Sequence, residues 1–439
     1  MTSVNRAAQA GESQIKLFEF YSNYNDPLDV SSSIVELQYY ESILDNSIRA
    51  TATFADTGYR KSGSGSAIVE EEDLNLTVGE KVNLKVVDGN QFELDFTGSK
   101  QLRIKETRNV EESTNKLTFT VDLFSKESID NELEQYRVRQ RFDGKISDSV
   151  EKILTEILKT QKEVDIDSTL NTLSFIGNVE KPFYKCTWLG PRSVPDVQNS
   201  KGNLAGFFFY ETYDGFKFKS IDKLFEQTPK RKLIFNNIIE TTPPPGYDGK
   251  ILDYSFDSAI DLKNVLLTGS QLNSKIKAVN AYESSYRENS FDSKNQFNET
   301  NTGGKEQPKI ASDLKIQEQN SRISYKWDDP GFLVPGKDLK EQLPKSTYIN
   351  YSNDEILRQS YMRYNNLFNI KLSIAIAGDM SLRAGDLLHC DFPEITENAT
   401  KSYSKKKSGI YMIIDVCHRV TKNSCYTRLN LVRESIGRK

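Results

Sequence analysis

The sequence predicts a mainly β protein with an α+β insertion: two similar small antiparallel β-barrels and a helix-containing middle region. Three observations lead to this fold class. Short runs that alternate apolar and polar residues, separated by turn residues, occupy both ends of the chain. Tyr and Phe number 21 and 23 among 439 residues, an excess typical of strands. A pattern near the C-terminus also recurs, more weakly, near the N-terminus.

The first barrel is predicted within residues 1–127. Its strands are Gln14–Phe20, Ile34–Tyr39, Ile48–Phe54, Val82–Val87, Phe92–Phe96, Leu102–Glu106 and Leu117–Phe124. Asp88-Gly89 is a strong hairpin turn signal between two of them. Because closing a sheet removes its exposed edges, we expect these short strands to form a closed or nearly closed barrel.

The middle region changes character after residue 128. A helix is predicted over 147–159, because Val150, Ile153, Leu154 and Ile157 lie on one face. A second helix is predicted from the capping box at 352–355 to about residue 366. Between them, the polar insertion 286–322 has few apolar residues, so we expect it to be disordered in the isolated chain or ordered by a partner.

The C-terminal seventy residues predict further antiparallel strands. Gly409–Val416 and Cys425–Arg433 are strand-like runs. Upstream, the stretch Phe207–Phe218 predicts a hairpin with aromatic arms, whose turn is Asp214-Gly215.

An internal repeat connects the two ends of the chain. Gly79-Glu80 and Gly385-Asp386 are both Gly-acidic turns that enter a strand. Val121 follows Gly79 by 42 residues and Leu429 follows Gly385 by 44, and both stand in strands that alternate with the same phase. Any two β-barrels share some of this pattern, but the matched spacing favours a genuine duplication.

Composition limits the classes of function. The net charge is −4, so no global basic field attracts nucleic acid. Four scattered cysteines indicate buried free thiols and synthesis in a reducing compartment, although Cys417 and Cys425 are placed to face each other across a hairpin. The sequence has neither an apolar signal region nor an apolar run of the ~20 residues that cross a bilayer.

Catalytic chemistry finds little support in the sequence. The two histidines, His389 and His418, stand in predicted strands without zinc-ligand spacing, and a structural role is favoured for both. No phosphate-binding glycine motif occurs. Asp and Glu number 62, so composition alone leaves a two-carboxylate glycosidase open. We predict no catalytic, cofactor-binding or metal-binding residues and no enzymatic activity.

Three segments, in order, carry a resemblance to a known family. They are Tyr39–Ser42 with Phe54–Gly58, the helix at 147–159 with the aromatic hairpin, and Gly378–Asp386 with the closing strands and His418. In this order they resemble the central baseplate hub proteins of contractile-tailed, T-even-like bacteriophages. They are also similar to the hub part of type VI secretion spike proteins. The polar insertion 286–322 has no counterpart in the resemblance.

The resemblance implies an architecture rather than a reaction. Such proteins form homotrimers in which each chain gives two similar barrels, so six barrels form a ring with near-sixfold symmetry. The expected partners are a trimeric spike protein, tail tube or tube-initiator proteins and other baseplate proteins. Genomic DNA is expected to pass through the ring without specific binding. The expected location is the baseplate of the virion tail, assembled in the host cytoplasm, without stable membrane insertion.

The resemblance also implies domain boundaries and framework residues. Its second barrel is discontinuous, so we expect 204–238, with the aromatic hairpin, to join the strands of 366–439, leaving 128–203 and 239–365 as the middle domain. The residues expected to shape the barrel framework are Gly79, Asp214, Gly215, Gly378, Asp379, Gly385, Asp386 and His418.

Two alternatives from other classes remain open at this point. A tail-associated cell-wall hydrolase predicts two carboxylates in a cleft and clearing of peptidoglycan. A receptor-binding tail protein predicts exposed aromatic side chains in a groove that binds surface glycans.

Overall fold

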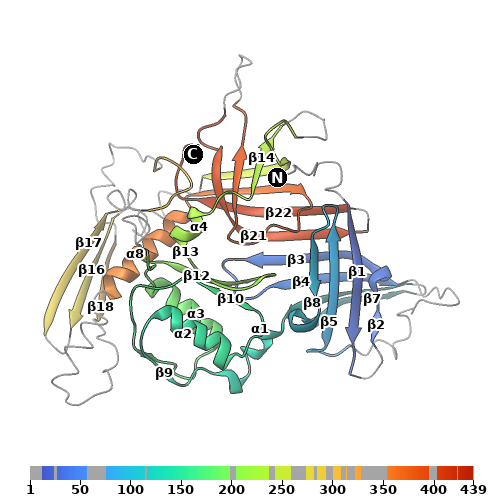
Figure 1. Ribbon diagram of the computed structural model, residues 1–439, viewed down its shortest axis with the longest axis horizontal. Helices are drawn as coiled ribbons and strands as arrows, with labels where there is room; N and C mark the ends of the chain where they lie inside the picture. Colours follow the sequence, from blue (N-terminus) through green and yellow to red (C-terminus); the bar gives the residue numbers. More distant parts are fainter. Residues whose placement is uncertain are drawn as a thin grey trace.

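The computed structural model gives the fold of the chain (Figure 1). It describes residues 12–23, 27–56, 76–113, 116–197, 204–236, 243–258, 273–280, 284–292, 300–307, 313, 322–327, 353–394, 403–422 and 424–438. None of the helices in these ranges is long and apolar enough to cross a membrane.

The N-terminal part is one strongly curved antiparallel sheet. Its strands are β1 Ser13–Tyr21, β2 Leu28–Asp29, β3 Ile34–Ser42, β4 Arg49–Asp56, β5 Lys81–Asp88, β6 Glu93–Phe96, β7 Leu102–Ser113 and β8 Lys116–Ser125. The order is β2-β1-β5-β7-β8-β4-β3, with β6 on the side of β5. Among the described residues β3 pairs with neither β1 nor β2, so strand pairing does not close this sheet, and closure of the predicted first barrel is not confirmed. The sheet encloses a core rich in phenylalanine, in which Phe18, Phe20 and Phe54 pack edge-on or tilted. All seven predicted strands are confirmed, and β7 extends well beyond its predicted end at Glu106.

The middle region is an α+β unit. Its elements are α1 Lys126–Asp130, β9 Arg141–Phe142, α2 Ile146–Lys152, β10 Glu163–Ile166, β11 Phe175–Ile176, α3 Pro182–Leu189, β12 Phe207–Thr212, β13 Gly215–Ser220 and α4 Ile221–Glu226. The helix predicted over 147–159 is confirmed, since α2 continues as a π-helical turn to Ile157. Its apolar face packs on the hairpin β12–β13.

The prediction that the aromatic hairpin joins the strands after residue 366 is wrong. β12 and β13 form a separate sheet with β10, in the order β10-β13-β12. Every residue of β12 is buried, because the strand lies between two cores. Phe207 and Phe209 face the α2–α3 core, while Phe208 and Tyr210 face a cluster shared with the C-terminal strands. Aromatic residues on both faces follow from this sandwiched position rather than from a place in a barrel wall.

The C-terminal part is a closed barrel of six strands. They are β14 Arg231–Phe235, β15 Gly249–Ser258, β19 Ile370–Ala377, β20 Leu387–Asp391, β21 Gly409–Thr421 and β22 Ser424–Arg433. The ring runs β21-β20-β14-β15-β19-β22 and returns to β21. Its core includes Tyr411, Leu388 and Leu429.

Two expectations about this barrel need correction. It is mixed rather than antiparallel, because β14 runs parallel to both β15 and β20. β14 and β15 therefore run in the same direction, although they follow each other in the sequence. In addition, β15 lies within 239–365, the range expected to be middle domain, yet its strand pairing places it in the barrel wall.

The remaining elements form an extension beside the barrel. β16 Asn273–Asn280, β17 Ser285–Asp292 and β18 Arg322–Trp327 make a three-stranded sheet, and α8 Asn353–Leu367 confirms the second predicted helix. Figure 1 shows this extension at the opposite end of the molecule from β1 and β7. Parts of the insertion 286–322 are therefore ordered within the chain: the backbone nitrogen of Asn301 donates to Asp222, and that of Gly303 to Glu434. The rest lies outside the described residues.

The two curved sheets are continuous with each other. β3 of the first sheet pairs antiparallel with β21 of the second barrel, from Ser42 opposite Asp415 to Glu36 opposite Thr421. One uninterrupted sheet therefore runs through both units.

Candidate functional site

The Gly-acidic turn of the first sheet has a defined hydrogen-bond pattern. Gly79 has φ +90°, a left-handed conformation that favours glycine. Its nitrogen donates to the oxygen of Ile104 at 2.8 Å, and the nitrogen of Ile104 donates to the oxygen of Glu80 at 3.0 Å. The Glu80 carboxylate closes the turn by accepting from the nitrogen of Thr77 at 3.0 Å.

The turn of the second barrel repeats this pattern bond for bond. Gly385 also has φ +90°. Its nitrogen donates to the oxygen of Ile413 at 2.9 Å, and the nitrogen of Ile413 donates to the oxygen of Asp386 at 2.9 Å. The Asp386 carboxylate accepts from the nitrogen of Arg383 at 2.8 Å. The repeat predicted from the sequence is thus confirmed in the turn geometry.

Most strand irregularities repeat as well, although β7 has an additional one between Arg108 and Glu111 that β21 lacks. β7 pairs with β8 and has a bulge between Ile104 and Glu106, while β21 pairs with β22 and has one between Ile413 and Asp415. β3 and β15 carry the same irregularity, between Ile34 and Glu36 and between Ile251 and Asp253. Bulges are specific local features, so their recurrence at matching positions indicates duplication rather than a generic likeness between barrels.

The correspondence extends to the order of strands. β3, β4, β5, β7 and β8 match β15, β19, β20, β21 and β22 in chain order, neighbours and antiparallel direction. The extension with β16–β18 and α8 is inserted between β15 and β19. It therefore occupies the place of the short connection between β3 and β4.

The two turn glycines provide a matched pair for mutation. A Cβ added at Gly79 would meet nothing within 4 Å, whereas one at Gly385 would lie 2.4 Å from the hydroxyl of Tyr210. We expect Gly79→Ala to lower the free energy of unfolding by about 1–2 kcal/mol through backbone strain. Gly385→Ala should cost about 2–3 kcal/mol because overpacking is added. Equal losses in urea denaturation would contradict this account of Gly385.

Four of the framework residues, Gly378, Asp379, Gly385 and Asp386, lie in residues 378–386, here called the junction loop. Its Met380 nitrogen donates to Asp88 of the first sheet at 2.9 Å, and its Ala384 nitrogen to Glu41 of β3 at 3.0 Å. Arg383 lies 3.3 Å from the carboxylate of Asp214 in the hairpin turn. The loop therefore joins the second barrel to both the first sheet and the middle region.

The other framework residues of the loop are held by close contacts. A Cβ on Gly378 would lie 2.3 Å from the sulfur of Cys425, so the strand β22 approaches its backbone directly. The carboxylate of Asp379 accepts from Arg231 at 2.8 Å. Burial opposes ionisation of Asp379, but Arg231 and the hydrogen bond from Ser381 outweigh it and lower the pKa of this carboxyl.

The hairpin turn Asp214-Gly215 has a second packing role. A Cβ on Gly215 would lie 2.2 Å from the oxygen of Glu163, where β10 runs beside β13. The glycine therefore permits close parallel pairing, while Asp214 faces the junction loop.

His418 is a structural residue of the barrel wall. It is fully buried, its Nδ1 lies 2.9 Å from the hydroxyl of Thr427, and its ring stacks on Tyr39 of the first sheet. Burial, and then the charge of Arg383, lower its pKa to about 3. The neutral imidazole packs at the contact between β3 and β21, and its burial leaves it inaccessible to a substrate.

Sequence reasoning missed Glu41 as the central polar group of this junction. The side chain is 2% exposed and accepts hydrogen bonds from the nitrogens of Tyr213 and Ala384 and the hydroxyl of Tyr39. Burial raises the pKa of its carboxyl. The sequence carried a signal for this position. Leu37, Tyr39 and Glu41 are every second residue of one strand, so the side chain of Glu41 is expected on the same inward face as the other two.

Metal and thiol chemistry find no site in the described part of the chain. No group of three or more His, Cys, Asp or Glu side chains there could hold a metal ion. The four cysteines are free, and three of them are buried. Cys417 stands opposite Arg428 and Cys425 opposite Val420, so the two do not face each other across the hairpin.

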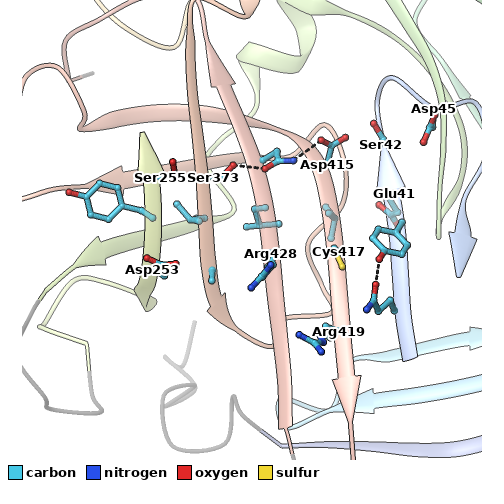
Figure 2. A pocket seen from close by; sticks show the side chains of 18 of the residues that line it. Glu41, Ser42, Asp45, Asp253, Ser255, Ser373, Asp415, Cys417, Arg419 and Arg428 are labelled. Carbon is cyan, nitrogen blue, oxygen red and sulfur yellow. Dashed lines mark hydrogen bonds between the residues drawn. The ribbon is translucent and has the colours of Figure 1, made fainter. Parts of the chain in front are cut away.

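Matching polar pairs occupy the outer face of the two units. The hydroxyl of Thr51 donates to Asp122 at 2.7 Å on the first, and that of Ser373 to Asn430 at 2.6 Å on the second. The face formed by β3, β21, β22, β19 and β15 contains a depression of about 590 Å³. Figure 2 shows it lined by both acidic and basic side chains, among which Asp415 accepts from Asn430.

Comparisons with solved structures show where this fold occurs. The tail protein from Neisseria meningitidis MC58 matches with a TM-score of 0.50 at 10% identity, over 95% of this chain and 96% of that one. The 43 kDa tail protein of prophage MuSo2 from Shewanella oneidensis matches with a TM-score of 0.51 at 8% identity, over 96% and 98%. The chain therefore shares the fold of these tail proteins over nearly its whole length, and the predicted resemblance is confirmed at the level of fold.

Further comparisons add little. A type VI secretion system component from E. coli matches at a TM-score of 0.43 and 10% identity, over 98% of this chain and 79% of that one, too low to establish a shared fold. No protein-family model and no curated protein matches the sequence.

Proposed function

We propose that this chain is a structural hub protein in the baseplate of a contractile phage tail. Three copies form a ring of six similar barrels, which adapts a hexameric tail tube to a trimeric central spike. The ring leaves a channel through which genomic DNA passes. The proposed location is the virion tail baseplate, assembled in the host cytoplasm, with other baseplate proteins and tube or tube-initiator proteins as neighbours.

The observation that carries this proposal is the internal duplication. Two units share turn hydrogen bonds, bulge positions and strand order, from Gly79 and Gly385 through β8 and β22. A threefold ring can match a sixfold ring only if each subunit presents its contact surface twice. Duplication of a whole sheet within one chain is what such an adaptor requires, and the likeness to two tail proteins supports the same assignment.

The outer face with the matching polar pairs suits the wall of the proposed channel. Acidic Asp415 and Asp253 and basic Arg419 and Arg428 are interspersed there. A wall of one positive sign would bind DNA phosphates and retard passage, whereas mixed charges and hydroxyls provide no such continuous site. A strongly Lys/Arg-lined channel in an assembled ring would count against this part of the proposal.

Solution mass is the experiment that tests the proposal. Sedimentation or light scattering of the purified chain over a concentration series is expected to show a trimer, three times the 50.0 kDa chain mass. A dimer or tetramer would contradict the hub, because neither can present six barrels as a threefold ring.

The two alternatives lead to different results. A cell-wall hydrolase would clear peptidoglycan and lose that activity on substitution of a paired carboxylate. A receptor-binding protein would bind host glycans through exposed aromatics. In the part of the chain that the structure describes, the large aromatics mostly line the cores, which favours the hub over the second alternative.

A further inference from the structure

The contact between the two units within one chain defines a junction of known register. β21 pairs with β20 through Met412 and then, from Asp415 onward, with β3. In this junction Cys417 lies opposite Tyr40, and Arg419 lies opposite Gln38. The Arg419 guanidinium makes a two-armed ion pair with Glu36, with N–O distances of 2.9 and 2.8 Å.

The counterparts of these two edges lack a neighbour among the described strands. β7, the counterpart of β21, pairs with β5 only at Leu102 and Arg103, and beyond them pairs with β8 alone. β15, the counterpart of β3, pairs with β14 only as far as Ile251 and then with β19 alone. Within the described residues, each therefore has one row of backbone donors and acceptors that no strand covers, and proteins normally cover such edges.

The exposed fractions of side chains on β7 and β15 are higher than those on β3, which suits edges that a partner covers. Leu37 and Tyr39 of β3 are each 2% exposed, whereas their counterparts Tyr254 and Phe256 are only half-buried. In β7 every residue from 105 to 111 is exposed, including Val110 at 62%. This part of β7 has only β8 as a neighbour among the described strands, so its other edge is accessible to a partner.

We propose that the free edge of β7 in one copy of this chain pairs with the free edge of β15 in the next copy. The pairing repeats the register of β21 on β3. This inference rests on the proposed function, and it specifies the surface by which a second copy binds. Each copy offers one edge of each kind at different places, so the contact is head-to-tail. Such a contact closes into a ring when the rotation between copies allows it, as the proposed trimer requires.

The duplication dictates the register. Arg108 corresponds to Cys417 and Asp257 to Tyr40, so Arg108 lies opposite Asp257 in the junction between copies. Both side chains are exposed in the single chain. An antiparallel pair in this position has Cβ atoms about 5 Å apart, close enough for opposite charges to attract.

At one position the side-chain charge has the opposite sign in the two junctions. The additional irregularity of β7 between Arg108 and Glu111 adds one residue, so Glu111 corresponds to Arg419. Asp253 corresponds to Glu36, so the ion pair within the chain is replaced by two carboxylates between copies. Like charges at this spacing repel. The junction between copies is therefore the weaker one, and restoring a basic residue at position 111 should strengthen it.

Cysteine cross-linking tests the register. We expect the double variant Arg108→Cys with Asp257→Cys to give covalent trimers with a short bis-maleimide reagent. The matched control keeps Arg108→Cys and moves its partner to Asp253→Cys, about 13 Å along the strand. It should give several-fold less product. Both variants retain the four native cysteines, so reaction of Cys417 is the same background in each.

A gain-of-function variant tests the charge difference. Glu111→Arg is expected to strengthen association about fivefold at each junction, the effect of a surface ion pair of about 1 kcal/mol. Glu156→Arg makes the same change of charge at an exposed position of the middle region and should leave association unchanged. Misfolding cannot explain a gain in association.

The outcomes separate this inference from the proposed function. A trimer by mass that cross-links equally in both cysteine variants, or that Glu111→Arg weakens, overturns the register but leaves the hub intact. Specific cross-links in open chains, without a trimer, support the pairing and contradict the closed ring. Absence of both trimer and cross-links overturns both.

Discussion

Replacing Glu41 by alanine is expected to lower the free energy of unfolding by about 3–5 kcal/mol. The side chain is buried where the first sheet, the hairpin and the junction loop meet. Its removal leaves the backbone nitrogens of Tyr213 and Ala384 without an acceptor and the Arg383 guanidinium without a buried counter-charge. Urea denaturation followed by circular dichroism measures the loss.

Two further variants give this prediction its controls. Glu41→Gln should cost less than Glu41→Ala, because the amide oxygen still accepts one of the two backbone nitrogens while its NH₂ opposes the other. Glu36→Ala, which removes a partly exposed partner of Arg419, should cost about 1 kcal/mol or less. A loss below 1 kcal/mol for Glu41→Ala would show that Glu41 does not hold the junction together.

Acidification is expected to destabilise the chain through His418. The folded-state pKa of about 3 lies below the unfolded value of 6.5, because the ring is buried and close to Arg383. As the pH falls below 6.5, His418 therefore binds a proton in the unfolded chain but stays neutral in the folded chain. The stability contributed by the neutral ring is fully present above pH 6.5 and is lost toward pH 3, at about 1.4 kcal/mol per pH unit.

The comparison with His418→Asn isolates this contribution. Isothermal denaturation at pH 7.0, 5.5 and 4.5 should show a stability difference between native chain and variant that narrows by about 2–3 kcal/mol over this range. The raised pKa of Glu41 acts in the opposite direction, adding stability as the pH falls, but it is common to both chains and cancels. A difference independent of pH would show that His418 titrates normally.

Local strand patterns were readable from the sequence because each buries one face. The alternation in Gln14–Phe20 or Leu117–Phe124 identifies a strand with one side on a core, and β1 and β8 occupy these positions. The same reasoning exposed the repeat, since Val121 and Leu429 mark equivalent strands at the same distance, within two residues, from their turns.

The partners of the aromatic hairpin were not readable in this way. A run such as Phe207–Tyr210 has no alternation, so the sequence identifies the strand but not the sheet. Only the structure shows that one face of β12 packs against α3 and the other against Met412. The parallel direction of β14 beside β15 and β20 depends likewise on how the whole chain folds, which no local pattern encodes.

The candidate site shows the same division. Glycines 79 and 385 carried a local signal, because a turn with positive φ selects glycine. The contacts of Arg383 with Glu41 and Asp214 join segments more than 150 residues apart. These contacts form only when the whole chain folds. Of these contacts, the sequence carried a signal only for the inward position of Glu41 in β3.

The rotational symmetry of the assembled particle tests the central claim most directly. Electron-microscopy class averages of the purified assembly, viewed along its axis, should show six similar lobes from the barrels with a threefold modulation from the inserted extension and the middle region. A particle with three lobes and no sixfold component, or one with twofold or fourfold symmetry, would contradict the proposal that duplication within the chain serves to match a sixfold tube.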